Sequence, residues 1–218
     1  MNAQIPPAQP QIDAINALME KAADALKSQD PQKPITLVYH DDTDGLSSGA
    51  IMAETLRRMD RKTEQYCMEQ IYPVPIMKIY EKARGPIVIM DLGVSSKYRS
   101  FICQQTKDRP TIILDHHGSF EKDLCPDDGK IFNINCNKYQ ISGDCYSSAS
   151  TLVYMFAQKL GINITDLAQL AVLGAFGDRN HMHGEDQESF SKYGLDYKVF
   201  EQAKNVTVSD VHVYRVKL

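Results

Sequence analysis

The segment ITLVYHDDTDG, residues Ile35–Gly45, decides the fold class of the chain. Its first five residues are a short apolar run rich in β-branched side chains, which predicts a strand buried on both faces. The polar residues after this strand end at Gly45, and apolar residues then recur at helical spacing over 46–59. A strand, a polar turn and a helix in this order form the repeating unit of an α/β protein.

The same unit recurs downstream. Three more apolar runs predict buried strands, at 86–90, 111–114 and 131–134. Apolar residues at helical spacing predict helices over 11–29, 147–160, 165–176 and 190–204, and an alternating tail follows at 206–216. We therefore expect an α/β fold with a parallel sheet of about five strands and helices on both faces.

The composition limits the class of protein. The 218 residues are 43% apolar and 24% charged, which is typical of a globular domain. The net charge of −4 disfavours a protein that coats nucleic acid non-specifically, although it allows a nuclease whose metal centre binds phosphate. The five cysteines form no Cys-x-x-Cys pair, and we see neither a signal pattern nor an apolar run of membrane-spanning length. We expect a cytoplasmic protein with reduced thiols and no membrane partner.

Polar side chains follow the first strand at alternate positions. In an extended turn, His40, Asp42 and Asp44 would point the same way, and Gly45 would let the chain enter the helix. Asp41 would face away from the other three. An Asx turn with a helix N-cap is the alternative interpretation of this segment, and it requires no metal ion.

Acids and histidines also follow later elements. Asp91 ends the strand at 86–90, where a turn residue is the alternative interpretation. Asp115, His116 and His117 end the strand at 111–114, and adjacent histidines behind an acid are poor turn formers and poor core residues. Asp178 ends a glycine-punctuated apolar helix, where the alternative is core packing followed by an exposed turn.

Together these residues predict a metal centre. The carboxyl ends of parallel strands meet at one edge of a sheet, so the side chains would lie close together. Clustered carboxylates repel one another, and a pair of divalent cations would offset that repulsion and suit phosphoryl chemistry. Oxygen ligands mixed with imidazole favour Mn²⁺, with Mg²⁺ or Co²⁺ as alternatives. The expected ligands are His40, Asp42, Asp44, Asp91, His116 and Asp178.

With these residues assembled, the sequence resembles the DHH phosphoesterase superfamily, named after the Asp-His-His motif that stands here at 115–117. The resemblance extends from His40 to Asp178 and is closest to the archaeal RecJ-like branch in style. The spacing of the first motif differs from that of the family-II inorganic pyrophosphatases. The motifs are LVYHDDTDGLSSGAI (37–51), IVIMDLG (87–93), IILDHHGS (112–119) and AVLGAFGDRN (171–180).

The resemblance implies how the ligands divide between the two cations. His40 and Asp42 would hold one ion, and Asp91 would bridge to the second. The remaining ligands of the second ion would be Asp44, His116 and Asp178.

The resemblance also implies roles outside the ligand set. His117 would contact the scissile phosphate, and Asp115 would orient its neighbours. Apart from the resemblance, Arg179 is a candidate phosphate contact because it stands beside Asp178. The catalytic set would comprise Asp91, Asp115, His116 and His117. Hydrolysis of a phosphodiester would leave a 5′-phosphate product.

Three segments are expected along the chain. Residues 1–33 would form a tail and a helix, 34–185 the phosphoesterase domain, and 186–218 a C-terminal helix or connector. No glycine-rich loop follows Asp178, so we expect the second, DHHA1-type domain of the family to be absent. The chain would then be a catalytic-domain fragment or a naturally short member.

Three functions remain open at this point. The first is an exonuclease on single-stranded DNA, RNA or short oligonucleotides that releases 5′-mononucleotides. The second is a phosphohydrolase of a small molecule, such as a cyclic dinucleotide, a bisphosphate nucleotide or pyrophosphate. The third is a scaffold that binds the GINS replication complex, as relatives of this fold act in the replicative helicase, although the complete ligand set favours an enzyme.

Overall fold

The computed structural model describes residues 6–92, 109–118, 130–183 and 189–206. Within them the strands form one five-stranded sheet in the order β2-β1-β3-β4-β5, and every neighbouring pair is parallel. The strands are β1 (Ile35–His40), β2 (Thr63–Met68), β3 (Ile87–Met90), β4 (Thr111–Asp115) and β5 (Ile131–Asn135).

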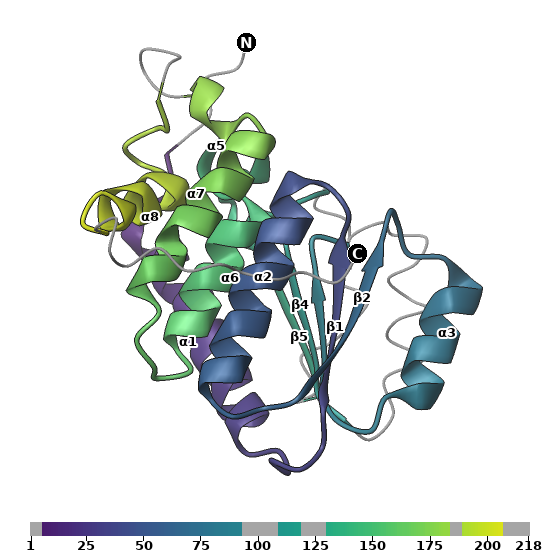
Figure 1. Ribbon diagram of the computed structural model, residues 1–218. Helices are drawn as coiled ribbons and strands as arrows, with labels where there is room; N and C mark the ends of the chain where they lie inside the picture. The colour runs from purple at the N-terminus through teal and green to yellow at the C-terminus, as the bar shows by residue number, and fades with distance from the viewer. Residues whose placement is uncertain (1–5, 93–108, 119–129, 184–188, 207–218) are drawn as a thin grey trace.

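Helices cover both faces of this sheet (Figure 1). On one face lies α3 (Pro73–Lys82), and the helices of the other face are α1 (Gln9–Lys27), α2 (Thr43–Arg58), α6 (Ala149–Gln158), α7 (Ala168–Gly177) and α8 (Leu195–Ala203). Shorter helical segments follow β5 and flank α7, namely η1 (Cys136–Tyr139), α5 (Gly143–Tyr146), η2 (Thr165–Leu167) and η3 (Asn180–His183). The predicted α/β class and parallel sheet are therefore confirmed.

Burial on both faces explains why the strands read as continuous apolar runs. In β1, Leu37 and Tyr39 belong to the larger core beneath α1, α2 and α6, whereas Val38 belongs to the smaller core beneath α3. All three side chains are inaccessible to solvent. Successive side chains of a strand point to opposite faces, so a strand covered twice needs apolar residues at every position.

The strand order determines where a site can form. The chain places β2 on one side of β1 and then crosses to add β3, β4 and β5 on the other side. At such a reversal, the loops that leave the carboxyl ends of β1 and β3 diverge and leave a crevice that ligands occupy in open parallel sheets. Ligand-binding side chains are therefore expected among the residues that follow these two strands.

Some elements differ from the sequence-based expectation. The edge strand β2 and the helix α3 were not predicted. β2 is half-buried throughout and so lacks an apolar run. α3 begins with Pro73, and proline usually marks a break in a helix although the first turn accepts it. The helix predicted from residue 46 begins three residues earlier, at Thr43. The helix predicted over 190–204 begins only at Leu195, after Gly194.

The remaining expectations concern other parts of the chain. The helix predicted over 165–176 is divided into the 3₁₀ turn η2 and the helix α7. Residues 207–216 of the predicted alternating tail lie outside the described residues, and the division of the chain into three segments stays a prediction. No helix in the described part of the chain is both long enough and apolar enough to cross a membrane.

The contact between α2 and β1 gives a test of this packing. A Cβ atom added at Gly49 would lie 2.8 Å from the ring of Tyr39. Gly49→Ala should therefore lower the free energy of unfolding by about 1–3 kcal/mol through overpacking. The higher helix propensity of alanine should offset about 1 kcal/mol of this loss. In a Tyr39→Ala background the same change should become stabilising, since the ring is gone. Equal destabilisation in both backgrounds, measured by urea unfolding, would contradict this packing.

Candidate metal centre

The loop between β1 and α2 supplies the first group of candidate ligands. His40 is the last residue of β1, and Asp42 is the N-cap of α2, where its Oδ1 accepts a hydrogen bond from Gly45 N at 2.9 Å. The Oδ2 atom of Asp42 lies 2.9 Å from Nδ1 of His40. A Cβ at Gly45 would lie 2.4 Å from the carbonyl oxygen of His40, so only glycine allows this tight turn.

Asp91 lies at the centre of the site. It follows β3, is 2% exposed, and has a φ of 61°, in the left-handed region that aspartate tolerates better than most residues. Its Oδ2 is 3.4 Å from Nδ1 of His40, while its Oδ1 is 3.5 Å from Nε2 of His116 and 3.4 Å from Nδ1 of His117. The carboxylate therefore connects the residues after β1 with those after β4.

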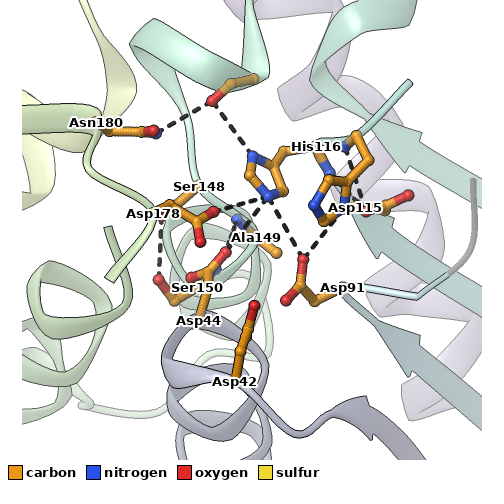
Figure 2. Close-up of polar contacts among 12 residues, drawn as sticks. Asp42, Asp44, Asp91, Asp115, His116, Ser148, Ala149, Ser150, Asp178 and Asn180 are labelled. Atoms are coloured by element: carbon orange, nitrogen blue, oxygen red, sulfur yellow. Dashed lines mark hydrogen bonds and ion pairs between the residues drawn. The ribbon is translucent and has the colours of Figure 1, made fainter. Parts of the chain in front are cut away.

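The Asp-His-His segment at the end of β4 is held by its own acid. Asp115 is fully buried, and its Oδ1 accepts a hydrogen bond from His116 N at 2.9 Å and lies 3.0 Å from Nδ1 of His117. Nε2 of His116 lies 2.9 Å from Oδ2 of Asp178 and 3.7 Å from Oδ2 of Asp44. Both imidazoles lie near Oδ1 of Asp91. Figure 2 shows that His116 also faces Asp44 and Asp178.

Asp44 is anchored by the start of α6. It is fully buried in the first turn of α2, and its two oxygens accept hydrogen bonds from Ala149 N at 2.7 Å and Ser150 N at 2.9 Å (Figure 2). The partial positive charge at a helix N-terminus favours a carboxylate there. A Cβ at Gly174 would lie 2.5 Å from Asp44 Oδ1, so glycine lets α7 approach this acid closely.

The structure brings all six predicted ligands together. The acid and histidine atoms that could hold a metal ion fall into overlapping groups whose members lie within 4.8 Å of one another. Two of these groups share no residue and use all six positions: His40, Asp42 and Asp91 in one, and Asp44, His116 and Asp178 in the other. The third group, Asp91, His116 and His117, shares Asp91 with the first group and His116 with the second.

Buried polar atoms without hydrogen-bond partners point into the same space. They include both carboxylate oxygens of Asp91, Nδ1 of His40 and Nε2 of His116. Buried polar groups are nearly always satisfied, and these atoms are of the oxygen and imidazole types that divalent cations bind. The residues therefore fit a pair of metal ions.

Two other predicted site residues, His117 and Arg179, lie at the rim, whereas Asp115 is buried. The side chain of His117 is 51% exposed, and Arg179 is exposed directly after Asp178 with a φ of 62°. Asp41 belongs to none of the candidate groups, although its Oδ1 is 3.6 Å from Nε2 of His40. His181 stacks on Phe176, with ring centroids 4.5 Å apart, and joins no candidate group among the described residues.

Sequence reasoning missed several residues that hold the histidines. Asn135 Nδ2 donates to the carbonyl oxygen of His117, and Asn137 Nδ2 donates to that of His116. Gly143 O accepts from Asn180 Nδ2 at 3.1 Å and lies 3.3 Å from Nδ1 of His116. Only Asn180 lies within a recognised motif, because contacts to backbone carbonyls leave no pattern in a sequence.

The charges in the cluster perturb one another. The neighbouring Asp91 carboxylate, 3.4 Å away, raises the pKa of His40 to about 9, against the effect of burial. Burial raises the pKa of Asp91, but His116 and His40 outweigh it and lower that pKa to about 2. Burial, followed by repulsion from Asp91, raises the pKa of Asp44 well above its usual value. Without a metal ion, the histidines therefore favour the charged form of Asp91, whereas burial favours the neutral form of Asp44.

Comparison with known proteins places this site in a family context. Residues 34–175 match the model of the DHH family, N-terminal domain. The curated "Uncharacterized protein MJ0831" of Methanocaldococcus jannaschii is 31% identical over 150 residues, which cover 67% of this chain and 33% of that protein. The chain therefore spans about a third of the length of this curated relative.

Solved structures share the fold. Exonuclease RecJ bound to manganese superposes with a TM-score of 0.58 at 17% identity, over 93% of this chain and 49% of the RecJ chain. CDC45 from Entamoeba histolytica gives a TM-score of 0.57 at 15% identity, over 88% of this chain and 36% of the CDC45 chain. At these identities the likeness concerns the fold alone.

The raised pKa of His40 predicts that metal binding releases protons. At pH 7.5 a group with a pKa of about 9 is protonated, and it must lose its proton before it can bind a cation. Mn²⁺ affinity should therefore increase with pH and level off near pH 9. Calorimetric titrations in two buffers of different ionisation enthalpy measure the protons released, and His40→Gln should release fewer. Equal heats in both buffers would contradict the protonated state of His40.

Proposed function

The chain belongs to the DHH family, and from this premise we propose that it is a phosphodiesterase that depends on two divalent metal ions. The observation that carries the proposal is the convergence of two complete ligand groups at one end of the sheet. Four carboxylates within a few ångströms of one another are costly unless cations compensate them. Histidines alone serve that purpose poorly, because imidazolium loses its charge as pH rises.

Each ion would have its own set of ligands. His40 and Asp42 would hold one ion and Asp91 would bridge to the other, which Asp44, His116 and Asp178 would complete. Two divalent ions would lower the pKa of a water molecule and neutralise charge on the phosphate oxygens. We propose Mn²⁺ as the preferred ion, with Mg²⁺ and Co²⁺ as alternatives, because the ligands combine carboxylate oxygens with imidazole and include no sulfur.

Differences in exposure indicate the side from which substrate would approach. The side chains of Asp42 and His117 are 43% and 51% exposed, whereas those of Asp44 and His116 are 0% and 4% exposed. The scissile phosphate would therefore meet the first group of ligands and His117.

At this exposed side, Asp115 would prepare His117 for contact with phosphate. Its hydrogen bond raises the pKa of His117 and engages Nδ1, so Nε2 remains to donate to a phosphate oxygen. Arg179, exposed beside Asp178, would provide a second contact to phosphate, in keeping with the affinity of guanidinium for that group.

The proposed substrates are single-stranded nucleic acids or short oligonucleotides, from which 5′-mononucleotides would be released. The shared fold with RecJ supports this choice. A small-molecule phosphohydrolase is the main alternative, because the net charge of −4 and the absence of tryptophan give little support for a long nucleic-acid path. Binding to the GINS complex, for which the CDC45-like fold is the only support, would be compatible with either activity.

Removal of the bridging carboxylate tests the proposed function. Hydrolysis of a labelled dinucleotide and of a longer single strand should require Mn²⁺ and should stop in chelator. Asp91→Asn should reduce the rate by about 10³-fold or more, since cations at a phosphoryl centre contribute several kcal/mol and each 1.4 kcal/mol is tenfold in rate. The substrate length preferred by the protein distinguishes the nuclease from the small-molecule enzyme.

Asp41→Asn is the matched control, because it neutralises a neighbouring exposed acid that belongs to neither ligand group. Its rate should stay within about fivefold of the unchanged protein, since exposed pairs contribute at most about 1 kcal/mol. A folded, Mn²⁺-loaded protein that cleaves neither substrate, or an Asp91→Asn variant as active as the control, would refute the proposed phosphodiesterase.

A further inference from the structure

A buried acid outside the predicted site connects to it from α8. Asp196 is 2% exposed and lies beyond residues 34–175, the region that matches the family model. Its Oδ1 accepts hydrogen bonds from Ser148 N at 2.9 Å and Ser148 Oγ at 3.2 Å, and its Oδ2 accepts one from Asn180 Nδ2 at 2.8 Å. Both oxygens are therefore engaged, each on a different path toward the site.

The first path leads to His116. Asn180 Nδ2, held by Asp196, also donates to the carbonyl oxygen of Gly143, and His116 Nδ1 lies 3.3 Å from the same oxygen (Figure 2). A proton on Nδ1 that donates to this carbonyl leaves Nε2 free to bind a metal ion, which is the arrangement that metal-binding histidines usually require. A Cβ at Gly143 would lie 1.9 Å from the carbonyl oxygen of His116, so the backbones are in direct contact.

The second path leads to Asp44. Ser148 is the N-cap of α6, and the next two backbone N–H groups of this helix, at Ala149 and Ser150, bind the Asp44 carboxylate. The hydroxyl of Ser148 also lies 3.0 Å from that of Ser150. Asp196 thus fixes the start of the helix that fixes Asp44.

We propose that Asp196 is a positioning residue for the metal ion held by Asp44, His116 and Asp178, and that its influence is selective for this ion. Asp196 reaches Asp44 through the first turn of α6, and it reaches His116 through Asn180 and the Gly143 carbonyl. The third ligand, Asp178, is two residues from Asn180. His40, the last residue of β1, and Asp42, the N-cap of α2, lie on neither path. The inference rests on the proposed metal centre.

The isosteric variant Asp196→Asn breaks the arrangement with little change of volume. An amide has one acceptor oxygen where the carboxylate has two, so either Ser148 N or Asn180 Nδ2 loses its partner. Substitution of residues that orient metal ligands typically weakens metal binding by about 10–100-fold. We expect a loss of this size, confined to one of the two ions.

Single-site backgrounds separate the two ions. Asp42→Ala disables the first ligand group and leaves Asp44, His116 and Asp178, whereas Asp178→Ala leaves the first group. Mn²⁺ titrations of the full chain, followed by electron paramagnetic resonance, should show that Asp196→Asn weakens binding at least about tenfold in the Asp42→Ala background. In the Asp178→Ala background the affinity should change less than about twofold. Equal weakening in both backgrounds, or none, would overturn the inference.

Gln202→Ala is the control for the packing of α8. Gln202 also connects α8 to α6, through Tyr154 and Gln158, at the end of α6 away from the site. This variant should leave both Mn²⁺ affinities unchanged. If Gln202→Ala weakens the binding of either ion as much as Asp196→Asn does, Asp196 acts through helix packing alone, which also overturns the inference.

Thermal melts in chelator establish that each variant is folded. If Asp196→Asn melts below the titration temperature, Asn180→Ser makes the same test, because it removes the path to His116 and keeps the hydrogen bonds between Asp196 and Ser148. Asn180→Ser should weaken Mn²⁺ binding at least about tenfold, and only in the Asp42→Ala background. A smaller loss of affinity, or an equal loss in both backgrounds, would overturn the inference. If the chain without substitutions binds no Mn²⁺, the metal centre itself is refuted. This outcome differs from two intact sites whose Mn²⁺ affinities do not change when Asp196 is substituted.

Discussion

The Asp91 carboxylate, held between the imidazoles of His40 and His116, is the interaction on which the rest of the site depends. A charged group that is 2% exposed is tolerated only when it is paired, and here the partners come from two other strands. They reach it because β1, β3 and β4 are consecutive neighbours in a parallel sheet and end at one edge. The left-handed backbone of Asp91 is a local cost, of about 1–3 kcal/mol, that this pairing offsets.

Around this carboxylate the two halves of the site are supported unequally. Asp44 and His116 are buried, and the backbone of α6 and the carbonyl of Gly143 fix them from behind. His40 and Asp42 lie on a short loop that is partly open to solvent, where the N-cap hydrogen bond is the main constraint on Asp42. A site of this kind combines a rigid half with an accessible half, which suits a centre that must keep its shape and still admit substrate.

The sequence predicted strands β1, β3, β4 and β5, and the acids and histidines that follow three of them, because both have strong local signals. All four strands are buried and largely apolar, and acids or histidines directly after such runs are easily noticed. The edge strand β2 escaped prediction because all its residues are half-buried, which removes the apolar signal, whereas the other edge strand, β5, is buried throughout. The support from Asn180 and Asp196 escaped it for another reason: a hydrogen bond to a distant backbone group imposes no spacing on the sequence.

Asp42 also shows why a structural and a functional interpretation of a residue need not compete. The sequence allowed either a helix N-cap or a cluster of ligands after β1, and the structure gives Asp42 both arrangements. One of its oxygens caps α2 through Gly45 N, and the other faces His40. A carboxylate has two oxygens and about four lone pairs, so a backbone contact that fixes its orientation leaves capacity for a cation. The same holds for Asp44, whose oxygens accept from α6 and still lie near His116. Ordinary capping contacts in this chain are therefore the means by which the acids are aimed at the site.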